Sequence, residues 1–589
     1  MPGPGIPPRL GGFRLKSGLR VGGNLGFPSG VLFATGPDQF QPMTNKNNDL
    51  FLGAARWPSG FNSWLDASAQ LGGIRAAATA KGAFAVAMQM PSGGPLLAVD
   101  RFAQQTLCWR LQDGNLLFSE RADALGPSGI DAQAVFEYLF FHVVPSPRTI
   151  FKDVQRLPAG HSATLVQGQV QVQPLARLQF KAPRRASFPS LKAEFRNLLT
   201  EAVKVELDGG TPACFLSGGT DSSTVAGHIK QVAGQVHTYS IGFDAAGYDE
   251  MEYARLAARH FGAEHHEYYV TPDDLVRSIA HVAQSYDQPF GNSSALPAYY
   301  CALKAREDGV TKILAGDGGD ELFGGNSRYA TQRLYGLYGQ LPGLLRGGLI
   351  EPLLALPGAQ HVSLLRKGRN YVRDAKVPLP DRMGHYNLLK RLGFTEVLSA
   401  EFLAAVQPDL PLQQQREVWA QAQADNDLDR MLAYDWRYTL AESDLPKVRG
   451  TTQLAGLQVG YPMLYDALVD FSMNLPTRYK LKGFKLRWFF KEALRDFLPE
   501  AIITKQKKGF GLPFGVWATQ HSALKALASD SVRGFATRGV VRPQFVKQLL
   551  DELLPAHPGY YGEMVWILMM LEQWLRGHAP DWRFEGAPG

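Results

Sequence analysis

Cysteine is scarce in this 589-residue sequence, which contains only Cys108, Cys214 and Cys301. They are odd in number, widely spaced and mostly in apolar surroundings, which argues against a disulfide framework or a CxxC metal site. With 45% hydrophobic and 20% charged residues, the composition is that of a globular chain. We expect two or three domains whose cores form without disulfides. A reducing, cytoplasmic setting suits these features best.

Long apolar runs are also lacking. The first residues, "MPGPGIPPRLGGFRLKSGLRVGGNLGF", are interrupted throughout by Gly and Pro and have no apolar signal-peptide core, so secretion is not expected. The most apolar late run, "MVWILMMLEQWL", is too short to span a bilayer and contains Glu572. It therefore predicts a buried helix, and no membrane association is expected.

Dense basic clusters are few. The net charge of +7 at pH 7 is modest for a chain of this length. Nucleic-acid-binding proteins typically show basic runs or a basic stripe, and only "KQKKGF" and the region near residue 480 come close. Both segments also suit phosphate binding, so nucleic acid is not an expected partner.

Hydrophobic patterning divides the chain into two main parts. Residues 1–45 are a poorly specified lead-in rich in Gly and Pro, and residues 46–180 contain short apolar stretches that predict a β-rich α+β domain. A charged segment with two prolines makes 181–194 the best linker. In residues 195–580 strands alternate with helices, which predicts a parallel sheet and a largely helical C-terminal part, and 581–589 is a tail. The predicted fold class is multidomain α/β.

The segment "CFLSGGTDSSTVAGHIK" has the pattern of an apolar strand, a turn of small residues and a helix. The strand ends at Leu216, and Gly218 and Gly219 let a ligand approach the backbone closely. A helix N-terminus here suits an anion, but Asp221 would repel it unless a cation such as Mg²⁺ lay between them. No Gly-Lys-Ser/Thr ending follows, which excludes the usual P-loop. A tight turn followed by a Ser or Asp N-cap remains an alternative for this motif taken alone.

A second Gly-rich turn, "KILAGDGGDELFGG", also follows an apolar strand and carries Asp317, Asp320 and Glu321. The carboxyl ends of parallel strands lie along one edge of a sheet, so the two turns are predicted to face one pocket. Asp221 and Asp320 would then share a metal ion. An unrelated acidic turn is the less favoured alternative.

Together these segments resemble the synthetase domain of the asparagine synthetase family, within the ATP pyrophosphatases that use an SGGxDS loop. The resemblance covers about residues 195–580 and continues in order through "TYSIGFD", "YDEMEYARLAARHFGAEHHE", "DQPFGNSSALPAYY", "YKLKGFKLRWFFKEALRDFLP" and "KKGFGLPFGVW". It implies an adenine-nucleotide α-hydrolase-like sheet. It also implies a ligase that adenylates a carboxylate with ATP and Mg²⁺, releases pyrophosphate and lets ammonia or an amine attack.

The resemblance also implies roles for individual residues. Asp221 and Asp320 would hold Mg²⁺, and Asp317 takes the position of an acidic residue linked to forming the adenylate. The implied nucleotide-binding residues are Leu216, Ser217, Gly218, Gly219, Thr220, Asp221, Ser222, Ser223, Ile241, Gly242, Ala315 and Gly316.

Basic residues are expected opposite these carboxylates. Lys447 in "DLPKVRG" matches a family lysine, for which the resemblance implies a catalytic role. Lys507 and Lys508 precede a Gly-Phe turn that could close over phosphates, although a solvated surface position suits them equally well. Arg487 stands where the family keeps a catalytic lysine. Because Arg does not readily lose a proton, Lys485, two residues earlier, is an alternative for that role.

A further departure from the family pattern lies in "LAGLQVGYPMLYD". Gln458 and Gly460 stand there in place of a family Glu and Arg, near the acceptor side of the pocket. This difference weakens an assignment of aspartate as the substrate.

Residues 80–165 resemble the Ntn-hydrolase-like glutaminase domain of the same family, through "KGAFAVAM", "LLAVDRFAQQTLCWR" and "TIFKDVQRLPAGHSATL". Glutamine-dependent members begin Met-Cys-Gly and use that cysteine, whereas this sequence begins Met-Pro-Gly and Cys108 falls in a predicted strand. We therefore expect a domain that keeps its fold without glutaminase chemistry, as in branches that form β-lactams or cyclise lasso peptides. Asp100 matches a family aspartate that meets the substrate amine, but a structural role is favoured for it here.

The leading hypothesis is an amide-forming ligase that joins a small-molecule or peptide carboxylate to ammonia or an amine. A homodimer, or a partner protein that supplies the amine, is compatible with it. The alternatives are a glutamine-hydrolysing asparagine synthase if the start is misassigned, a lasso-peptide or β-lactam cyclase, a tRNA-modifying adenylating enzyme, and a non-catalytic ATP-binding paralogue.

Overall fold

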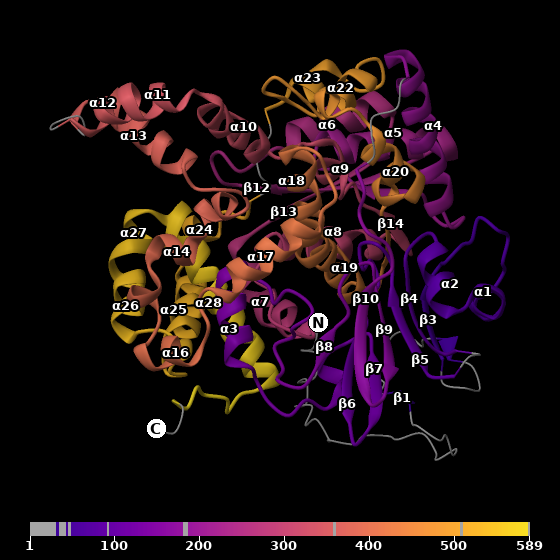
Figure 1. The fold of residues 1–589 in the computed structure, drawn as a ribbon, viewed down its shortest axis with the longest axis horizontal. Coiled ribbons are helices and arrows are strands. Elements are labelled where there is room, and N and C mark those ends of the chain that lie inside the picture. The colour runs from indigo at the N-terminus through magenta and orange to yellow at the C-terminus, as the bar shows by residue number, and fades with distance from the viewer. Residues whose placement is uncertain are drawn as a thin grey trace, which may run out of the picture.

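The computed structural model describes residues 31–33, 43–44, 49–90, 93–180, 186–356, 361–506 and 511–586. Most of the predicted lead-in, the start of the predicted linker, and both Lys507 and Lys508 lie outside the described residues. The described chain forms a sheet-rich N-terminal part and a larger C-terminal part (Figure 1). This confirms the predicted fold class.

The described residues of the N-terminal part form two sheets. One is antiparallel throughout, with strand order β10-β9-β5-β4-β3-β2. The other has the order β1-β7-β6-β8, and only its β1–β7 pair is parallel. The strands are β1 (Val31–Phe33), β2 (Met43–Thr44), β3 (Leu50–Gly53), β4 (Phe84–Gln89), β5 (Pro95–Val99), β6 (Cys108–Gln112), β7 (Asn115–Ser119), β8 (Gln155–Arg156), β9 (His161–Val166) and β10 (Gln169–Pro174).

The larger N-terminal sheet is covered on both faces, because successive side chains of a strand point to opposite sides. In β4, Ala85 joins a core with Phe118 of the second sheet. Its neighbour Val86 faces the other way and packs in a cluster with α1 (Trp64–Leu71) and α2 (Gly73–Thr79). The apolar run "GAFAVAM" is therefore a strand with two buried faces.

The C-terminal part is built around a parallel sheet with strand order β13-β12-β11-β14-β15. The chain passes from β11 outward to β12 and β13 on one side, and places β14 and β15 on the other. Ligands of open α/β sheets bind at such a switch point, beyond the carboxyl ends of the strands. The strands are β11 (Ala213–Phe215), β12 (His237–Phe243), β13 (Glu264–Val270), β14 (Lys312–Leu314) and β15 (Gln458–Gly460).

Helices connect these strands and form most of the remainder. Helix α5 joins β11 to β12, α6 joins β12 to β13, and α7 and α8 lead from β13 to β14. Within the described residues, no helix combines the length and hydrophobicity needed to cross a bilayer. The principal helices are α3 (Ala132–Phe141), α4 (Phe188–Glu206), α5 (Thr220–Ala233), α6 (Met251–Phe261), α7 (Pro272–Ser285), α8 (Ala295–Glu307), α9 (Gly319–Phe323), α10 (Ser327–Gln340), α13 (Ser363–Ala375), α17 (Leu410–Gln421), α18 (Asp427–Asp435), α19 (Leu445–Leu454), α20 (Asp466–Asn474), α22 (Trp488–Ala493), α24 (Phe514–Gln520), α25 (Ser522–Ala536) and α28 (Pro558–His578).

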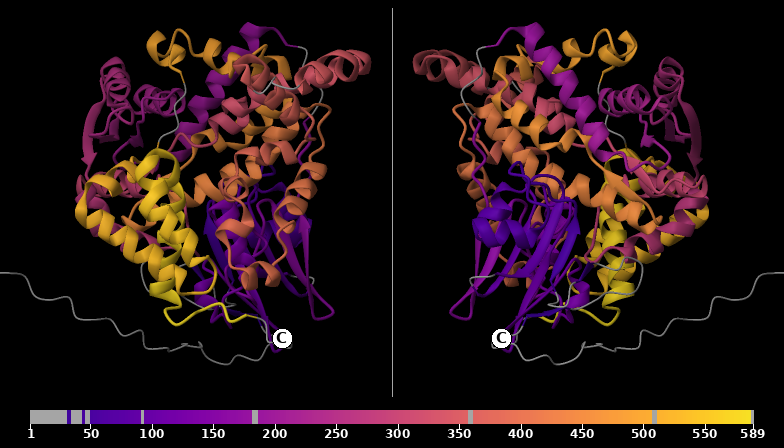
Figure 2. Two further views of the ribbon diagram at one scale, coloured as in Figure 1. Left: turned by 90° about the vertical axis from the view of Figure 1, so that its left-hand side faces the viewer. Right: turned by 90° about the vertical axis from the view of Figure 1, so that its right-hand side faces the viewer.

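A buried ion-pair network joins the two parts, which pack closely together (Figure 2). The carboxylate of Glu442 accepts a hydrogen bond from Ser146 Oγ at 2.6 Å and pairs with Arg156, both from the N-terminal part. Arg437 Nη1, from the C-terminal part, lies 2.8 Å from Glu442 Oε1, the oxygen that Ser146 also contacts. The charge of Glu442 is thus balanced by groups from both parts, which fixes their contact.

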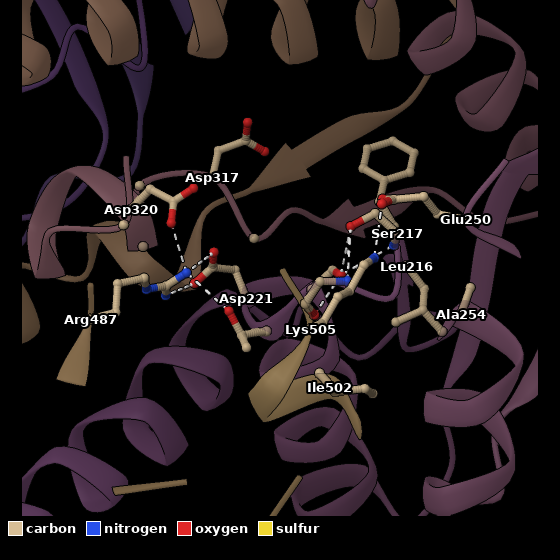
Figure 3. A pocket seen from close by; sticks show the side chains of 18 of the residues that line it. Leu216, Ser217, Asp221, Glu250, Ala254, Asp317, Asp320, Arg487, Ile502 and Lys505 are labelled. Carbon is tan, nitrogen blue, oxygen red and sulfur yellow. Dashed lines mark hydrogen bonds and ion pairs between the residues drawn. The ribbon is translucent and has the colours of Figure 1, made fainter. Parts of the chain in front are cut away.

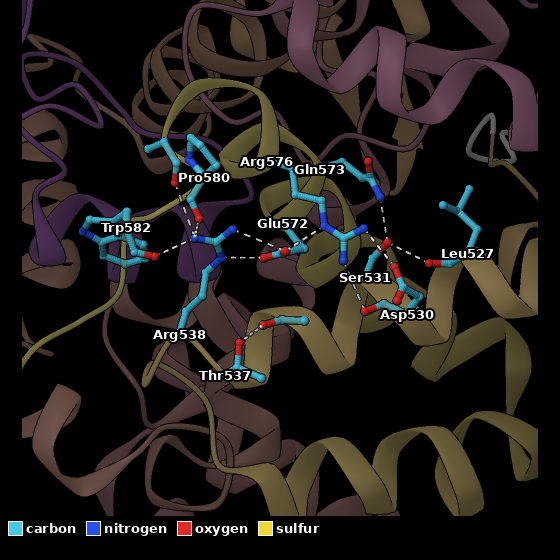
Figure 4. Close-up of polar contacts among 12 residues, drawn as sticks. Leu527, Asp530, Ser531, Thr537, Arg538, Glu572, Gln573, Arg576, Pro580 and Trp582 are labelled. Atoms are coloured by element: carbon cyan, nitrogen blue, oxygen red, sulfur yellow. Dashed lines mark hydrogen bonds and ion pairs between the residues drawn. The ribbon is translucent and has the colours of Figure 1, made fainter.

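Helix α28 contains the apolar run that was predicted to be buried, and most residues of 564–575 are indeed buried. The charged residue within this run, Glu572, lies 2.6 Å from Arg538 Nε and 2.8 Å from Arg576 Nε (Figure 4). Arg538 also donates to the carbonyl oxygen of Trp582 at 2.5 Å. The buried carboxylate is therefore paired, and the chain after α28 is held against the helix.

Replacing Glu572 with alanine is expected to lower the free energy of unfolding by about 3–5 kcal/mol, because Arg538 would be left buried without its carboxylate. Urea unfolding followed by near-ultraviolet circular dichroism measures this loss. The control is Glu201→Ala, which breaks an exposed pair with Lys204 and should cost at most about 1 kcal/mol. Similar losses in the two variants would contradict this view of the buried pair.

Candidate functional site

The turn between β11 and α5 forms one side of a cavity. The backbone N–H of Ser217 donates to Ser222 Oγ at 3.1 Å, so the first turn of the helix closes back on the loop. Gly218 has φ +67°, and a Cβ there would lie 2.5 Å from the backbone nitrogen of Ala254. Only glycine fits that position without displacement. The N-terminal turn of α5, the positive end of its dipole, opens onto the cavity.

The turn after β14 lies directly against the first turn. A Cβ at Gly319 would fall 2.0 Å from Asp221 Oδ1, and a Cβ at Gly325 would fall 1.7 Å from Asp320 Oδ1. The two glycines therefore leave the space that the two carboxylates fill. Both turns line one cavity of about 980 Å³ (Figure 3). The predicted meeting of the two Gly-rich turns is thus found in the structure.

Most of the predicted site residues lie on the wall of this cavity. They are Leu216, Ser217, Gly219, Thr220, Asp221, Ser222, Ile241, Gly316, Asp317, Asp320, Lys447, Lys485 and Arg487.

Four predicted nucleotide-binding residues do not line the cavity. Gly218 is turned toward α6, and Ser223 is fully buried with no hydrogen-bond partner for its hydroxyl among the described residues. A Cβ at Gly242 would lie 2.6 Å from a tyrosine ring, so this glycine is needed for packing. Ala315 is buried and donates its backbone N–H to the carbonyl of Gly460 at 2.9 Å. These four residues pack behind the cavity wall and do not face the cavity.

Arg487 lies between the two predicted metal ligands (Figure 3). Its Nη1 is 2.7 Å from Asp221 Oδ2 and 2.8 Å from Asp320 Oδ1, and donates to Thr220 Oγ1 at 3.0 Å. The guanidinium is 3.9 Å from the centre of the Phe490 ring, and the residue is only 5% exposed. Burial by itself would lower the pKa of Arg487, but Asp221 and Asp320 together raise it above its usual value. Arg487 is therefore a permanent cation that cannot serve as a base.

Lys485 does not occupy this position. It is exposed in the short strand β17 (Lys485–Leu486), whereas Arg487 adopts φ +53° just before α22 and contacts the carboxylates. Lys491, one helical turn after Arg487, also lines the cavity. Burial and the charge of Arg487 lower the pKa of Lys491. Lys491 therefore loses its proton more readily than Arg487 does. Its four-residue spacing from Arg487 on a predicted helix is the signal that could have identified it.

Asp317 and Lys447 form a second charged pair in the cavity. Lys447 Nζ lies 3.6 Å from Asp317 Oδ1 and 3.0 Å from Asp444 Oδ1. Burial raises the pKa of Asp317 to about 6, opposed by the attraction of Lys447 and reinforced by repulsion from Asp444 and Asp221. Burial acts against the charge of Lys447, but Asp444 and Asp317 raise its pKa above the usual value. A carboxyl group whose pKa is raised to about 6 thus lies beside a stable cation.

Lys505 lines the cavity but was not among the predicted site residues. Its Nζ lies 3.1 Å from Glu250 Oε2, 3.4 Å from the carbonyl oxygen of Gly218 and 4.3 Å from the centre of the Tyr253 ring. A cation from the C-terminal part therefore reaches the first Gly-rich turn. Lys505 is the first residue of the basic segment "KQKKGF", but its partners lie more than two hundred residues earlier in the chain, so the segment alone does not reveal these contacts.

The departures at Gln458 and Gly460 lie in β15, outside the cavity wall. Gln458 is exposed, and a Cβ at Gly460 would lie 2.5 Å from Glu206 Oε2. Glu206 is in turn paired with Lys312 Nζ at 3.0 Å. Local packing thus explains the glycine at position 460. Neither Gln458 nor Gly460 lines the cavity, so neither residue identifies a substrate bound there.

Asp100 has the structural surroundings that its sequence context favoured. Its buried carboxylate accepts backbone N–H groups from Phe84 at 3.1 Å and Phe102 at 2.9 Å. Burial raises the pKa of Asp100 to about 6 despite these bonds. Asp100 therefore ties β4 to the turn after β5.

Comparison with protein families gives two matches, one for each part of the chain. A family described as "Asparagine synthase" matches residues 194–576. A family described as "Glutamine amidotransferase domain" matches residues 63–176. The first match covers the parallel sheet, both Gly-rich turns and all the cavity residues described above.

Several curated proteins are similar to this chain. "Asparagine synthetase [glutamine-hydrolyzing] 1" of Bacillus subtilis (strain 168) is 24% identical over 450 residues, covering 76% of this chain and 68% of the relative. "Asparagine synthetase [glutamine-hydrolyzing] 3" of the same organism is 22% identical over 378 residues, covering 61% and 55%. "Amidase chyE" of Penicillium rubens is 23% identical over 502 residues, covering 77% and 74%. The chain thus spans between about half and three quarters of the length of these relatives.

Proposed function

The chain belongs to the asparagine synthase family of ligases, and we propose that it activates a carboxylate with Mg·ATP, releases pyrophosphate and transfers the acyl group to ammonia or an amine. One observation carries this proposal: two Gly-rich turns bring Asp221 and Asp320 to a single cationic centre in one cavity. Asp317 and Lys447 lie on the wall of the same cavity.

The donor set suits Mg²⁺. The carboxylates of Asp221 and Asp320 already converge on one cation, the guanidinium of Arg487. Mg²⁺ prefers oxygen ligands and is commonly bound through one or two carboxylates together with substrate phosphates. When bound, it supplies positive charge to the polyphosphate of ATP. Asp221 and Asp320 would hold the ion, and Arg487 would remain beside them as a second, permanent cation.

The other cavity residues would bind and orient the substrates. The N-terminal turn of α5, including Ser222, suits the pyrophosphate end, while Leu216 and Ile241 offer apolar surface to the nucleotide. Arg487 would stabilise the negative charge that develops on the leaving pyrophosphate. Lys447 lowers the pKa of Asp317 and so favours its ionised form.

We further propose that the nitrogen comes from ammonia or an amine and is not released from glutamine by a cysteine of this sequence. Cys108, Cys214 and Cys301 are all buried, and burial raises the pKa of each thiol above its usual value. The thiolate is the nucleophilic form, so none of the three is suited to attack glutamine. No glutamate should form when glutamine is the only nitrogen source, and its release by the purified chain would contradict this part of the proposal.

Exchange of labelled pyrophosphate into ATP tests the proposed activation step. The purified chain is incubated with ATP, Mg²⁺ and a panel of amino-acid and peptide carboxylates that includes aspartate. Exchange is expected with the matching carboxylate only, and chelation of Mg²⁺ should stop it. ATP binding without exchange across the whole panel would contradict the proposal and favour a non-catalytic paralogue.

A further inference from the structure

We propose that His237, Glu264 and His266 bind a divalent metal ion of the transition-metal class, and we expect that ion to be Zn²⁺. Each residue offers one ligand atom, an imidazole nitrogen or a carboxylate oxygen, and these three atoms lie within 4.8 Å of one another. The three residues belong to β12 and β13, at the amino ends of these strands. The site is thus separate from the Asp221 and Asp320 carboxylates, and the proposal does not depend on the ligase function.

The strand register explains how the three side chains come together. His237 lies directly opposite Glu264 in the parallel β12–β13 pair, and His266 lies two residues further along β13. Residues two apart on a strand share a face, so all three side chains project to the same side of the sheet. His265 falls on the opposite face, where its Nδ1 lies 2.8 Å from Thr238 Oγ1.

The ring of His266 is held in a fixed orientation. Its Nδ1 lies 3.0 Å from Asp308 Oδ2, and the hydroxyl of Tyr239 donates to the same oxygen at 3.0 Å. The Tyr239 ring also stacks on the His266 ring, with centroids 4.6 Å apart and an interplanar angle of 14°. A carboxylate on one imidazole nitrogen is the usual arrangement for a metal-binding histidine, because it leaves the other nitrogen as the ligand.

The other nitrogen of His266 carries the strongest argument for a cation. Nε2 is buried and has no hydrogen-bond partner among the described residues, yet Glu264 Oε1 lies 3.5 Å from it. With the proton on Nδ1, a nitrogen lone pair would face a carboxylate, which is repulsive. Buried polar atoms are normally satisfied, and a metal ion between these two ligands would satisfy both.

The composition of the cluster selects the kind of ion. His237 Nδ1 lies 3.7 Å from Glu264 Oε2, so two imidazoles and one carboxylate converge. Imidazole suits Zn²⁺ and related transition metals, whereas Mg²⁺ and Ca²⁺ prefer oxygen ligands. The side chains of His237 and His266 are 22% and 29% exposed and that of Glu264 is 66% exposed. An ion could therefore enter from solvent and keep water as its remaining ligand.

Metal titration of the full chain tests the proposal without any measurement of activity. After chelator treatment, the protein is titrated with Co²⁺, read by its visible absorption, and with Zn²⁺ by calorimetry, both in excess Mg²⁺ to occupy oxygen-ligand sites. One equivalent is expected to bind. His266→Gln should abolish it, and Asp308→Asn should weaken it by about 10- to 100-fold.

His265→Gln is the matched control, because it changes the adjacent histidine on the opposite face of the same strand, and it should bind metal like the unaltered chain. Glu264→Gln changes an exposed side chain, so it should weaken binding while the thermal transition of the metal-free protein stays unchanged. The proposal is overturned if the unaltered chain binds neither ion, or if His266→Gln and His265→Gln bind equally well.

Discussion

Replacing Asp221 with asparagine is expected to reduce carboxylate-dependent pyrophosphate exchange by about 100- to 1,000-fold. Asp221 is one of two carboxylates that converge on Arg487. It accepts hydrogen bonds from both Nη1 and Nη2 of the guanidinium. A neutral amide of nearly the same shape fits the space beside Gly319, but it cannot neutralise the positive charge of a metal ion. Initial exchange rates at saturating Mg²⁺ and ATP measure the loss.

Glu492→Gln is the matched control, because Glu492 also lines the cavity but is paired with the exposed residue Arg495 at 2.9 Å. Its exchange rate should change little. Thermal unfolding of both variants shows whether Asp221→Asn remains folded. A folded Asp221→Asn protein with an unchanged exchange rate would rule out Asp221 as a ligand of the metal.

The fold could be predicted well from the sequence because its two parts have different hydrophobic patterns. Short apolar runs separated by turn residues, such as "GAFAVAM", predicted the N-terminal strands, and apolar strands between helices predicted the parallel sheet. The buried position of Glu572 followed from the apolar run around it. Its partner Arg538 did not, because a pairing between α28 and the segment after α25 depends on packing that no local pattern encodes.

The meeting of the two Gly-rich turns was predictable for a topological reason. β11 and β14 are adjacent parallel strands, so the residues after both strands emerge at one edge of the sheet. The sequence could not decide between Lys485 and Arg487, because they are only two residues apart. The φ angle of +53° at Arg487 turns that side chain to the carboxylates and leaves Lys485 at the rim.

Four of the predicted nucleotide-binding residues lie away from the cavity wall, and one cavity residue, Lys505, was not predicted. Ser223 and Gly242 belong to the matching segments, but a helix and a strand each present one face to the cavity and another to the core. Lys505 contacts the first turn across the fold, so its proximity required the three-dimensional structure. The pairing of His237 with Glu264 likewise depends on the register of β12 and β13, which the letters "AEHHE" alone do not specify.

Replacing Lys447 with methionine is expected to lower the exchange rate by about 100-fold or more and to move its acid limb to higher pH. Asp317 has a pKa of about 6, and the attraction of Lys447 holds it below the value that burial alone would give. If the ionised carboxylate is required, activity falls as the pH drops through about 6 and the group becomes protonated. Without Lys447 the pKa of Asp317 rises, so the same fall occurs at a higher pH. Exchange rates measured from acid to neutral pH report both effects.

Two further variants separate this effect from a general loss of positive charge in the cavity. Asp317→Asn cannot titrate at this position, so its remaining activity should lack the limb near pH 6. Lys491→Met removes another cavity lysine that is not among the main groups shifting the pKa of Asp317, so its rate should fall while the midpoint of the limb stays nearly in place. An unmoved midpoint in Lys447→Met would contradict the pairing as the control of Asp317. A midpoint shared by Asp317→Asn and the unaltered chain would assign the limb to a different group.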